Sequence, residues 1–172
     1  MVVKFIAMPE IIIISKGKEY PCLYDEADRE LISQYQWSLH SKGYAQTTIK
    51  GKTVLMHRLV MKVTDPKIEV DHRFHNKLDN RKSKLRACNH SENRRNSRKE
   101  KNCSSKYKGS YFETERGIYH SQIGFATDNG TKVYNLGRYA DERLAGKAYD
   151  RKAVELFGRF ACVNFQSSKE YQ

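Results

Sequence analysis

The first half of the chain alternates short apolar runs with polar turns, which predicts several small strands. The run "EIIIIS" at residues 10–15 is compact and β-branched, and "KGKEYPCLYD" at 16–25 has turn residues at both ends. The stretch "YAQTTIKGKTVLMH" at 44–57 predicts a hairpin whose turn includes Lys50, Gly51 and Lys52. Residues 31–37 fit a short helix or a turn that packs on these strands, and residues 57–63 fit one helical segment.

The last third of the chain has a different pattern. The stretches "YKGSYFET", "IYHSQIGFAT" and "KVYNLGRY" predict three strands, with turns at Gly117 and at residues 128–130. Residues 141–157 carry apolar side chains at helical spacing, and Gly158 supplies a stop. We therefore expect a three-stranded antiparallel sheet with one helix on its back and the other face free. On the second strand, alternation directs four side chains to one face: Tyr119, Ser121, Ile123 and Phe125.

Between these regions lies a polar segment, "VDHRFHNKLDNRKSKLRACNHSENRRN", at residues 70–96. A helix is expected near its end, with Asn89 as a cap and Glu92 three residues on. The following "RRNSRKEKNCSSKYK" has no apolar face, so we interpret it as a linker or as an extended arm lying on a polyanion.

Composition narrows the class of partner. The chain has 172 residues, 38% of them apolar, and a formal charge of +12. Eleven Lys and Arg against two Glu give residues 81–108 a balance of +9. Large apolar residues are nearly absent between residues 89 and 105, so nucleic acid is favoured over an acidic membrane as the partner. No apolar run approaches the ~18 residues of a membrane span, and the N-terminus lacks the cleavage site of a signal peptide.

The four cysteines are far apart and form no C-x-x-C pair. A structural zinc site is therefore not expected, and the thiols indicate a reducing, cytoplasmic compartment.

Residues 70–93 offer the groups that phosphodiester hydrolysis needs. A histidine can deprotonate water near neutral pH. One hard cation can bind both the phosphate and the leaving oxygen, with oxygen ligands of which few come from protein. Asp71 and Asn93 offer two such oxygens, and His72 lies beside the first.

This segment resembles the core of HNH endonucleases, especially the intron-encoded homing type of phages and bacteria. The resemblance implies a strand hairpin followed by a helix, which together hold one divalent cation, Mg²⁺ or Mn²⁺. Asp71 and Asn93 would bind the metal and His72 would be the general base. The upstream "HRLV" at 57–60 resembles the segment that precedes this core in the same proteins. Four residues match the turn of the hairpin: Asn76, Asp79, Asn80 and Arg81.

Two positions depart from that pattern. Lys84 stands at the catalytic-core position where the family has the Asn that braces the His-bearing loop, and Lys lacks a carbonyl acceptor. This change is natural divergence, a weakened enzyme or an inactivating substitution. His75 stands where Gly is common, and either strains the turn or adds a phosphate contact. A competing interpretation is that Asp71, His72 and the asparagines are only turn formers and helix caps. That interpretation would suit an isolated Asp-His pair better than the complete pattern found here.

Residues 107–165 resemble the Apetala/ethylene-response-factor DNA-binding domain known in plants and in phage HNH proteins. Matching positions include Gly109, Ile123, Leu136-Gly137, Ala148-Tyr149-Asp150, Ala153 and Asn164-Phe165. The resemblance implies that the free sheet face enters the major groove. That face would present Lys108, Tyr111, Glu113, Arg116, Gln122 and Asn135.

Specificity is expected to differ from the plant proteins, because Gly124 and Val133 stand where those often have Arg. For Tyr111 packing remains an alternative, and for Lys108 and Arg116 a solvated charge. A further basic set is expected to contact phosphates rather than bases: Arg94, Arg95, Arg98, Lys99 and Lys101.

The sequence thus predicts an α+β protein with a mixed nuclease domain at residues 1–100 (ββα-metal core 68–96), a basic linker at 101–106 and a reader domain at 107–166. The predicted function is a metal-dependent DNA endonuclease of a phage or bacterial mobile element. It would act on double-stranded DNA as a monomer or dimer, probing a site through the reader and nicking a strand. The main alternative is a non-catalytic DNA-binding regulator with a degenerate core, supported by Lys84. An RNA-binding protein is a weaker alternative, because the sheet lacks an exposed aromatic stack.

Overall fold

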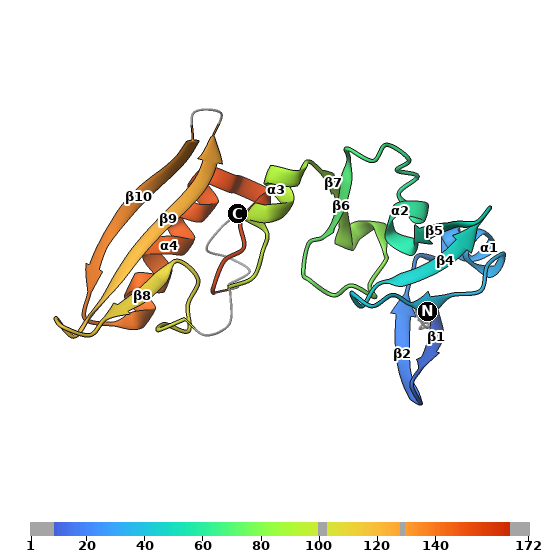
Figure 1. Ribbon diagram of the computed structural model, residues 1–172, viewed down its shortest axis with the longest axis horizontal. Coiled ribbons are helices and arrows are strands. Elements are labelled where there is room, and N and C mark those ends of the chain that lie inside the picture. The colour runs from blue at the N-terminus through green and yellow to red at the C-terminus, as the bar shows by residue number, and fades with distance from the viewer. Residues whose placement is uncertain (1–8, 100–102, 128–129, 166–172) are drawn as a thin grey trace, which may run out of the picture. The chain divides into compact units, whose positions relative to one another are not determined.

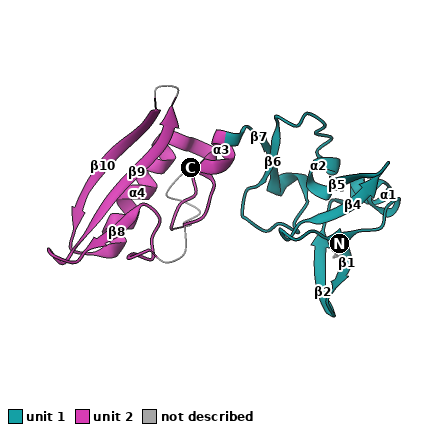
Figure 2. Cartoon of the chain, in the orientation of Figure 1, with its two compact units in different colours: residues 1–90 teal, residues 91–172 magenta. Residues whose placement is uncertain are grey.

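The computed structural model describes residues 9–99, 103–127 and 130–165. The chain divides into two compact units, residues 1–90 (unit 1) and 91–172 (unit 2), coloured separately in Figure 2. The described residues form an α+β protein with two two-stranded and two three-stranded antiparallel sheets. The division between the units falls inside the predicted nuclease core, and the domain boundaries drawn from the sequence stay a prediction. No helix within the described ranges combines the length and apolarity needed to cross a membrane.

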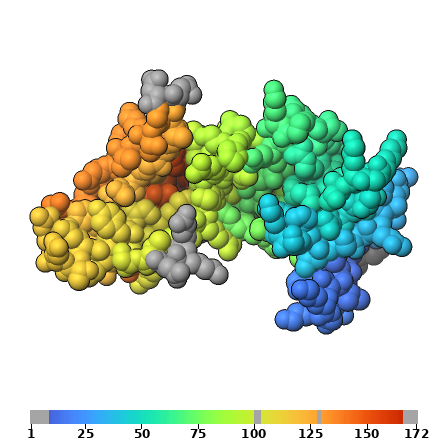
Figure 3. Space-filling view, viewed as in Figure 1, coloured from blue at the N-terminus to red at the C-terminus, as the bar shows by residue number. Residues whose placement is uncertain are grey.

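Unit 1 begins with a hairpin of β1 (Glu10–Ser15) and β2 (Lys18–Leu23), whose tip extends beyond the rest of unit 1 in Figures 1 and 3. Its two-residue turn places Lys16 at φ 51° and Gly17 at φ 72°, the left-handed geometry that suits tight hairpins. The run of isoleucines alternates as a strand should: Ile13 is buried, whereas Ile12 and Ile14 are exposed. Only one face of this hairpin therefore contributes to the core.

A small sheet and two short helices complete the body of unit 1. They are α1 (Arg29–Ser33), β3 (Ser38–Leu39), β4 (Ala45–Ile49), β5 (Lys52–Leu55) and α2 (Met56–Val60). β4 and β5 form the predicted hairpin, which turns at Lys50 and Gly51. The buried core of unit 1 also includes residues of the first hairpin and of the segments near residues 70 and 85, and it consists of Ile13, Cys22, Tyr24, Ile32, Ala45, Met56, Val60, Val70 and Leu85.

A second antiparallel pair follows, β6 (Glu69–His72) and β7 (Leu85–Cys88), with a 3₁₀ turn at Lys82–Lys84 before β7. Its register sets Asp71 opposite Arg86 and His72 opposite Leu85. The short helix α3 (His90–Arg95) begins directly after Asn89, as predicted, and includes the "RR" that opens the stretch interpreted as a linker or an extended arm.

Unit 2 contains the predicted three-stranded sheet, β8 (Ser110–Glu113), β9 (Ile118–Thr127) and β10 (Gly130–Tyr139), in the order β10-β9-β8. Gly117 turns at φ 65° between β8 and β9. Residues 128 and 129 of the other predicted turn lie outside the described residues. The helix α4 (Glu142–Phe157) covers one face of this sheet (Figure 1).

The predicted helix ends and sheet faces are confirmed in unit 2. The Asp141 carboxylate accepts a hydrogen bond from the Arg143 amide at 2.6 Å, and Gly158 ends the helix at φ 49°. The Ser121 hydroxyl donates to the carbonyl of Ala145 at 2.8 Å, so that side of β9 faces α4. The opposite face of the sheet is not covered by α4.

A buried carboxylate links Asn164 and Phe165 to α4. Asp150 is fully buried and accepts hydrogen bonds from the amides of Asn164 and Phe165 and from the Asn164 side chain, at 2.8–3.0 Å. Asn164 in turn accepts from the amide of Lys108 at 2.6 Å. Asp150, Asn164 and Phe165 belong to the positions that carry the resemblance to the Apetala-type domain, and here they have a structural role.

Candidate functional site

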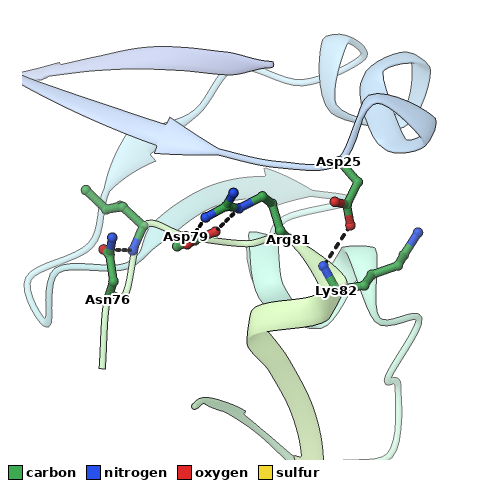
Figure 4. Close-up of polar contacts among 6 residues, drawn as sticks. Asp25, Asn76, Asp79, Arg81 and Lys82 are labelled. Atoms are coloured by element: carbon green, nitrogen blue, oxygen red, sulfur yellow. Dashed lines mark hydrogen bonds and ion pairs between the residues drawn. The ribbon is translucent and has the colours of Figure 1, made fainter. Parts of the chain in front are cut away.

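The loop between β6 and β7 is held against the first hairpin by its own backbone. Leu23 donates to the carbonyl of Leu78 and accepts from the amide of Asn80, both at 2.8 Å, so Asp79 forms a parallel bridge with Leu23. The Asn76 carboxamide accepts from the Leu78 amide at 3.2 Å and closes a local turn, shown in Figure 4. The loop therefore depends on β2 for its position.

Charged side chains fix the second half of this loop (Figure 4). Arg81 forms a two-point ion pair with Asp79, at 2.7 and 2.5 Å. Asp25 accepts from the Lys82 amide at 2.7 Å, and the Lys82 ammonium pairs with Asp28 at 2.7 Å. Burial opposes the charge on Asp79, but the hydrogen bonds and charge of Arg81 outweigh it and lower the pKa of this carboxyl.

Asn80 is completely buried under the loop and links it to the core. Its amide donates to the sulfur of Cys22 at 3.1 Å. Burial raises the pKa of the Cys22 thiol to about 12, although the Asn80 contact acts in the opposite direction. Cys22 is thus an inert thiol that packs against Met56.

Asp71 is buried at the end of the β6–β7 hairpin and paired with a guanidinium. Its Oδ2 atom lies 2.8 Å from Nε and 2.6 Å from Nη2 of Arg86, and both side chains are 8% exposed. The two residues are cross-strand partners, so the sheet register itself brings them together. An ion at Asp71 would share that carboxylate with Arg86.

His72 lies in a cluster of three rings. Its ring centroid is 4.9 Å from that of His57, with an edge-on angle of 74°, and 5.7 Å from that of Tyr44. Tyr44 also contacts His57 at 5.0 Å. All three rings come from different elements: the loop before β4, helix α2 and strand β6.

Burial controls the charge of both histidines. It lowers the pKa of His57 to about 3, with the neighbouring His72 and Arg58 acting in the same direction. Burial also lowers the pKa of His72, while hydrogen bonding by Asn80 and the charges of Asp71 and Asp79 oppose the change. Both rings are therefore neutral at pH 7, and a neutral imidazole is the form that can accept a proton.

Lys84 braces the His72 loop through its backbone. Its carbonyl accepts from the amide of Arg73, the residue after His72, at 2.9 Å. The ammonium lies 5.1 Å from the ring centroid of Phe74, and the guanidinium of Arg73 lies 5.8 Å from the same ring. The backbone bracing is thus available to any residue at position 84, whereas the side chain carries a cation toward an exposed ring.

His75 takes the backbone conformation for which glycine is common. Its φ is 63°, in the left-handed region, and its amide closes a turn by donating to the carbonyl of His72 at 2.9 Å. Of the two alternatives drawn from the sequence, the strained turn is therefore present, and the phosphate contact stays a prediction.

The two predicted metal ligands stand in different units. Asp71 belongs to β6 in unit 1, and Asn93 belongs to α3 in the part of the chain assigned to unit 2. Their convergence on one ion stays a prediction. The described residues contain no group of three or more His, Cys, Asp and Glu side chains that could hold a metal ion.

The uncovered face of the unit 2 sheet carries an interacting set of polar side chains. Glu113 contacts the Nε2 atom of His120 and pairs with Arg116 at 3.2 Å. The Tyr111 ring stacks on His120 with centroids 4.9 Å apart and an angle of 11°. The contact with His120 and the charges of Arg116 and Arg138 lower the pKa of Glu113. Arg116 remains 57% exposed, held by this carboxylate.

Gln122 and Asn135 are cross-strand partners on the same face, and both are exposed. The Asn135 side-chain oxygen accepts from the Gly137 amide at 3.1 Å, at the bulge of β10. Gln122 is therefore the better candidate for paired hydrogen bonds to a base edge, because the oxygen of Asn135 already holds the backbone.

Two basic residues for which a DNA contact is predicted also have contacts within unit 2, and their DNA contacts stay a prediction. The Lys108 ammonium donates to the carbonyls of Arg95 and Ser97, at 3.1 and 2.5 Å, and burial lowers its pKa. The Arg95 guanidinium lies 5.2 Å from the ring centroid of Phe157. Arg94 and Arg98 are exposed and Lys99 is half-buried, while Lys101 lies outside the described residues.

A comparison with known proteins identifies the family. A protein named as an uncharacterized HNH endonuclease of Acanthamoeba polyphaga mimivirus is 32% identical over 138 residues, covering 78% of this chain and 69% of the relative. The chain belongs to the HNH endonuclease family. Because neither unit exceeds 90 residues, the similarity extends into both. No family model and no solved structure matches this HNH chain.

Family membership indicates a nuclease function, and the geometry adds residues that the sequence analysis did not assign to its site. His57 and Tyr44 contact the ring of His72, and Arg86 pairs with Asp71. Arg86 directly follows the "KL" of the matched segment. Once β6 and β7 are paired as a hairpin, the strand register places it opposite Asp71. The "HRLV" at residues 57–60 places His57 shortly before the core, but the contact of its ring with His72, fifteen positions away in another element, required the structure.

Proposed function

We propose that this HNH chain is a divalent-metal-dependent DNA endonuclease of the homing type, which nicks one strand at a site selected by the uncovered sheet face of unit 2. One observation carries the proposal. In a member of this family, a neutral, buried His72 follows Asp71 at the end of a two-stranded hairpin and is held by two further rings.

The donor set suits a hard cation. The carboxylate of Asp71 and the carboxamide of Asn93 supply oxygen, which Mg²⁺ and Mn²⁺ prefer. With two protein ligands, water and the DNA phosphate would complete the coordination. Such an ion, when bound, neutralises the phosphate and the leaving oxygen.

The residues of the chain have separate tasks in this proposal. His72 accepts the proton of the attacking water through its neutral imidazole, and His57 and Tyr44 restrict the orientation of that ring. Arg86 orients Asp71 from the opposite strand. In unit 2, Arg116 and Gln122 contact base edges, Glu113 positions Arg116 and His120, and Arg94 and Arg98 contact phosphates.

The alternative function is a DNA-binding regulator without catalysis, and Lys84 is the observation that favours it. A cation at this position opposes binding of a metal ion nearby. The proposed enzyme retains the backbone contact of Lys84 to Arg73, so the two functions differ in activity and not in fold.

A plasmid assay tests the proposal. Supercoiled DNA incubated with the full chain and Mg²⁺ or Mn²⁺ should relax to the nicked form, and a chelator should prevent this. His72→Ala should lower the rate by about 100-fold or more, since general-base catalysis contributes 10²–10⁴. Thr64→Ala, at an exposed residue of unit 1 outside the site, serves as the control. Sequence-specific DNA binding without nicking in any divalent metal would leave the regulator.

A further inference from the structure

Unit 1 contains an open cleft away from the residues discussed so far. It has a volume of about 510 Å³ and is lined by residues 34–38, 46–48 and 53, which come from the end of α1 and the β3–β4–β5 sheet. We refer to it as the Trp37 cleft. Its volume falls within the roughly 300–1,000 Å³ of small-molecule sites.

The lining of the Trp37 cleft is uncharged, in a chain of net charge +12. It combines amides and hydroxyls with two aromatic rings. Six of its polar side chains make no hydrogen bond to any other described residue: Gln34, Gln36, Gln46, Thr47, Thr48 and Thr53. A phosphate would find no cation here, whereas a neutral ligand with several donors and acceptors would find many partners.

The aromatic part of the cleft is fixed in place. The indole N–H of Trp37 donates to the carbonyl of Ile32 at 2.9 Å. Tyr35 packs edge-on against it, with ring centroids 6.2 Å apart and an interplanar angle of 81°. A rigid ring beside unused amides and hydroxyls favours a flat, uncharged, polar ligand, because stacking and edge hydrogen bonds can then act together.

We propose that the Trp37 cleft binds an unpaired nucleobase of a DNA strand. The strongly basic chain attracts the polyanion, and the uncharged cleft accepts the base, the flat and uncharged part of a nucleotide that can stack on Trp37. A base can enter only when it is unstacked and unpaired, so the cleft favours single-stranded or locally opened DNA. This goes beyond the proposed cleavage, which requires no base to leave the duplex.

Trp37 is the single tryptophan of the chain, so its fluorescence reports directly on the cleft. The full chain is titrated with a short single-stranded oligonucleotide and with an abasic strand of equal length and charge. We expect saturable quenching by the first strand and binding that is about tenfold or more weaker for the abasic strand, as expected for one or more stacked bases.

A double variant tests the polar lining. Gln36→Ala with Thr53→Val removes an amide and a hydroxyl while keeping a β-branched residue in β5. It should bind the base-containing strand as weakly as the abasic one. Thr64→Val, at an exposed threonine of unit 1 outside the cleft, should behave as the wild type. Urea denaturation of each variant verifies that unit 1 is folded.

Three results would overturn the proposal: no change of Trp37 fluorescence, equal affinity for the abasic strand, or an unchanged double variant. His72→Ala should keep the full fluorescence response. Nicking without a Trp37 fluorescence response would reject base binding in the Trp37 cleft but not the proposed cleavage. A base-dependent fluorescence response without nicking would reject the proposed cleavage but not base binding in the cleft.

Discussion

Arg86 and Asp71 face each other across β6 and β7, with Nε and Nη2 of the guanidinium both directed at the Oδ2 atom of the carboxylate. In the interior of a protein, such a pair is costly to break from one side, because the remaining charge is left without compensation. The pair also weakens the attraction that Asp71 offers to a metal ion, because the positive charge of Arg86 lies next to the same carboxylate. Arg86 thus links the stability of unit 1 to the affinity of the proposed metal site.

Replacing Arg86 by Gln should therefore have two opposite effects. The free energy of unfolding should fall by about 3 kcal/mol or more without metal, and added Mn²⁺ should recover more stability in this variant than in the wild type. Urea denaturation followed by Trp37 fluorescence measures both quantities. In the double variant Asp71→Asn/Arg86→Gln the response to Mn²⁺ should disappear, and an equal response in all three proteins would contradict a metal site at Asp71.

The buried histidines should make unit 1 sensitive to acid. Above pH 6.5, His57 is neutral in both the folded and the unfolded chain. Below pH 6.5 the unfolded chain binds a proton that the folded imidazole, with its pKa lowered to about 3, does not bind. Stability should therefore fall as the pH decreases from 6.5 toward 3, by up to about 1.4 kcal/mol per pH unit for this residue.

Denaturation of the wild type and of His57→Gln at pH 7.5 and pH 5 checks the sign. The variant should lose stability at pH 7.5 through lost packing with Tyr44 and His72, yet lose about 2 kcal/mol less than the wild type on going to pH 5. Parallel decreases in the two proteins would mean that His57 is not protected from protonation.

The left-handed turn at His75 offers a stabilising substitution. His75→Gly should raise the free energy of unfolding by about 0.5–1 kcal/mol, because glycine adopts a φ of 63° without the steric cost of a side chain. His75→Ala is the matched control, since it removes the imidazole but keeps the strain, and it should give no gain. If both variants gain equally, the imidazole and not the backbone is the source of the effect.

Lys84 decides between the enzyme and the regulator. Lys84→Asn keeps the backbone contact to Arg73, removes a cation and restores the carboxamide usual in the family. We expect nicking to increase by about tenfold or more, the size of effect seen for residues that orient a metal ligand. Lys84→Ala removes the cation alone. A higher nicking rate in Lys84→Asn but not in Lys84→Ala would assign the effect to the carboxamide. No nicking in either variant would support the function as a non-catalytic regulator.

The two kinds of DNA contact proposed for unit 2 should separate by salt dependence. Gln122→Ala should weaken binding to the specific site by about 1–3 kcal/mol and relax the base preference, with an unchanged salt slope. Arg94→Ala should weaken binding to all sequences and reduce the slope of log K against log salt by about 1. Binding curves at several salt concentrations, on specific and random DNA, measure both. Two variants with the same pattern would contradict the division of roles.

Local signals in the sequence were sufficient for most of the fold. Alternation and turn residues predict the β4–β5 hairpin and the strands of unit 2, and Asp141 and Gly158 mark the ends of α4, because each of these features depends on neighbours in the chain. The prediction failed where tertiary contacts decide. Arg94 and Arg95 continue α3, although their stretch has no apolar face of its own.

The candidate site was predictable as a set of residue types but not as an arrangement. The motif predicts Asp71 and His72 as site residues. The neighbours that bury His72 include Tyr44 and His57, and their positions depend on how the small sheets pack. Lys108 shows the opposite limit. Its charge predicts a DNA contact, which stays a prediction, whereas the hydrogen bonds of its ammonium to two backbone carbonyls could not be predicted from composition.

The bridge between Leu23 and Asp79 determines the smallest segment of this protein that could be transferred to another scaffold. Residues 70–90 form a continuous segment, but the main chain of their loop is hydrogen-bonded to Leu23, the last residue of β2. Grafting residues 70–90 onto another protein would therefore require the first hairpin as well, or a strand edge that offers the same backbone donor and acceptor.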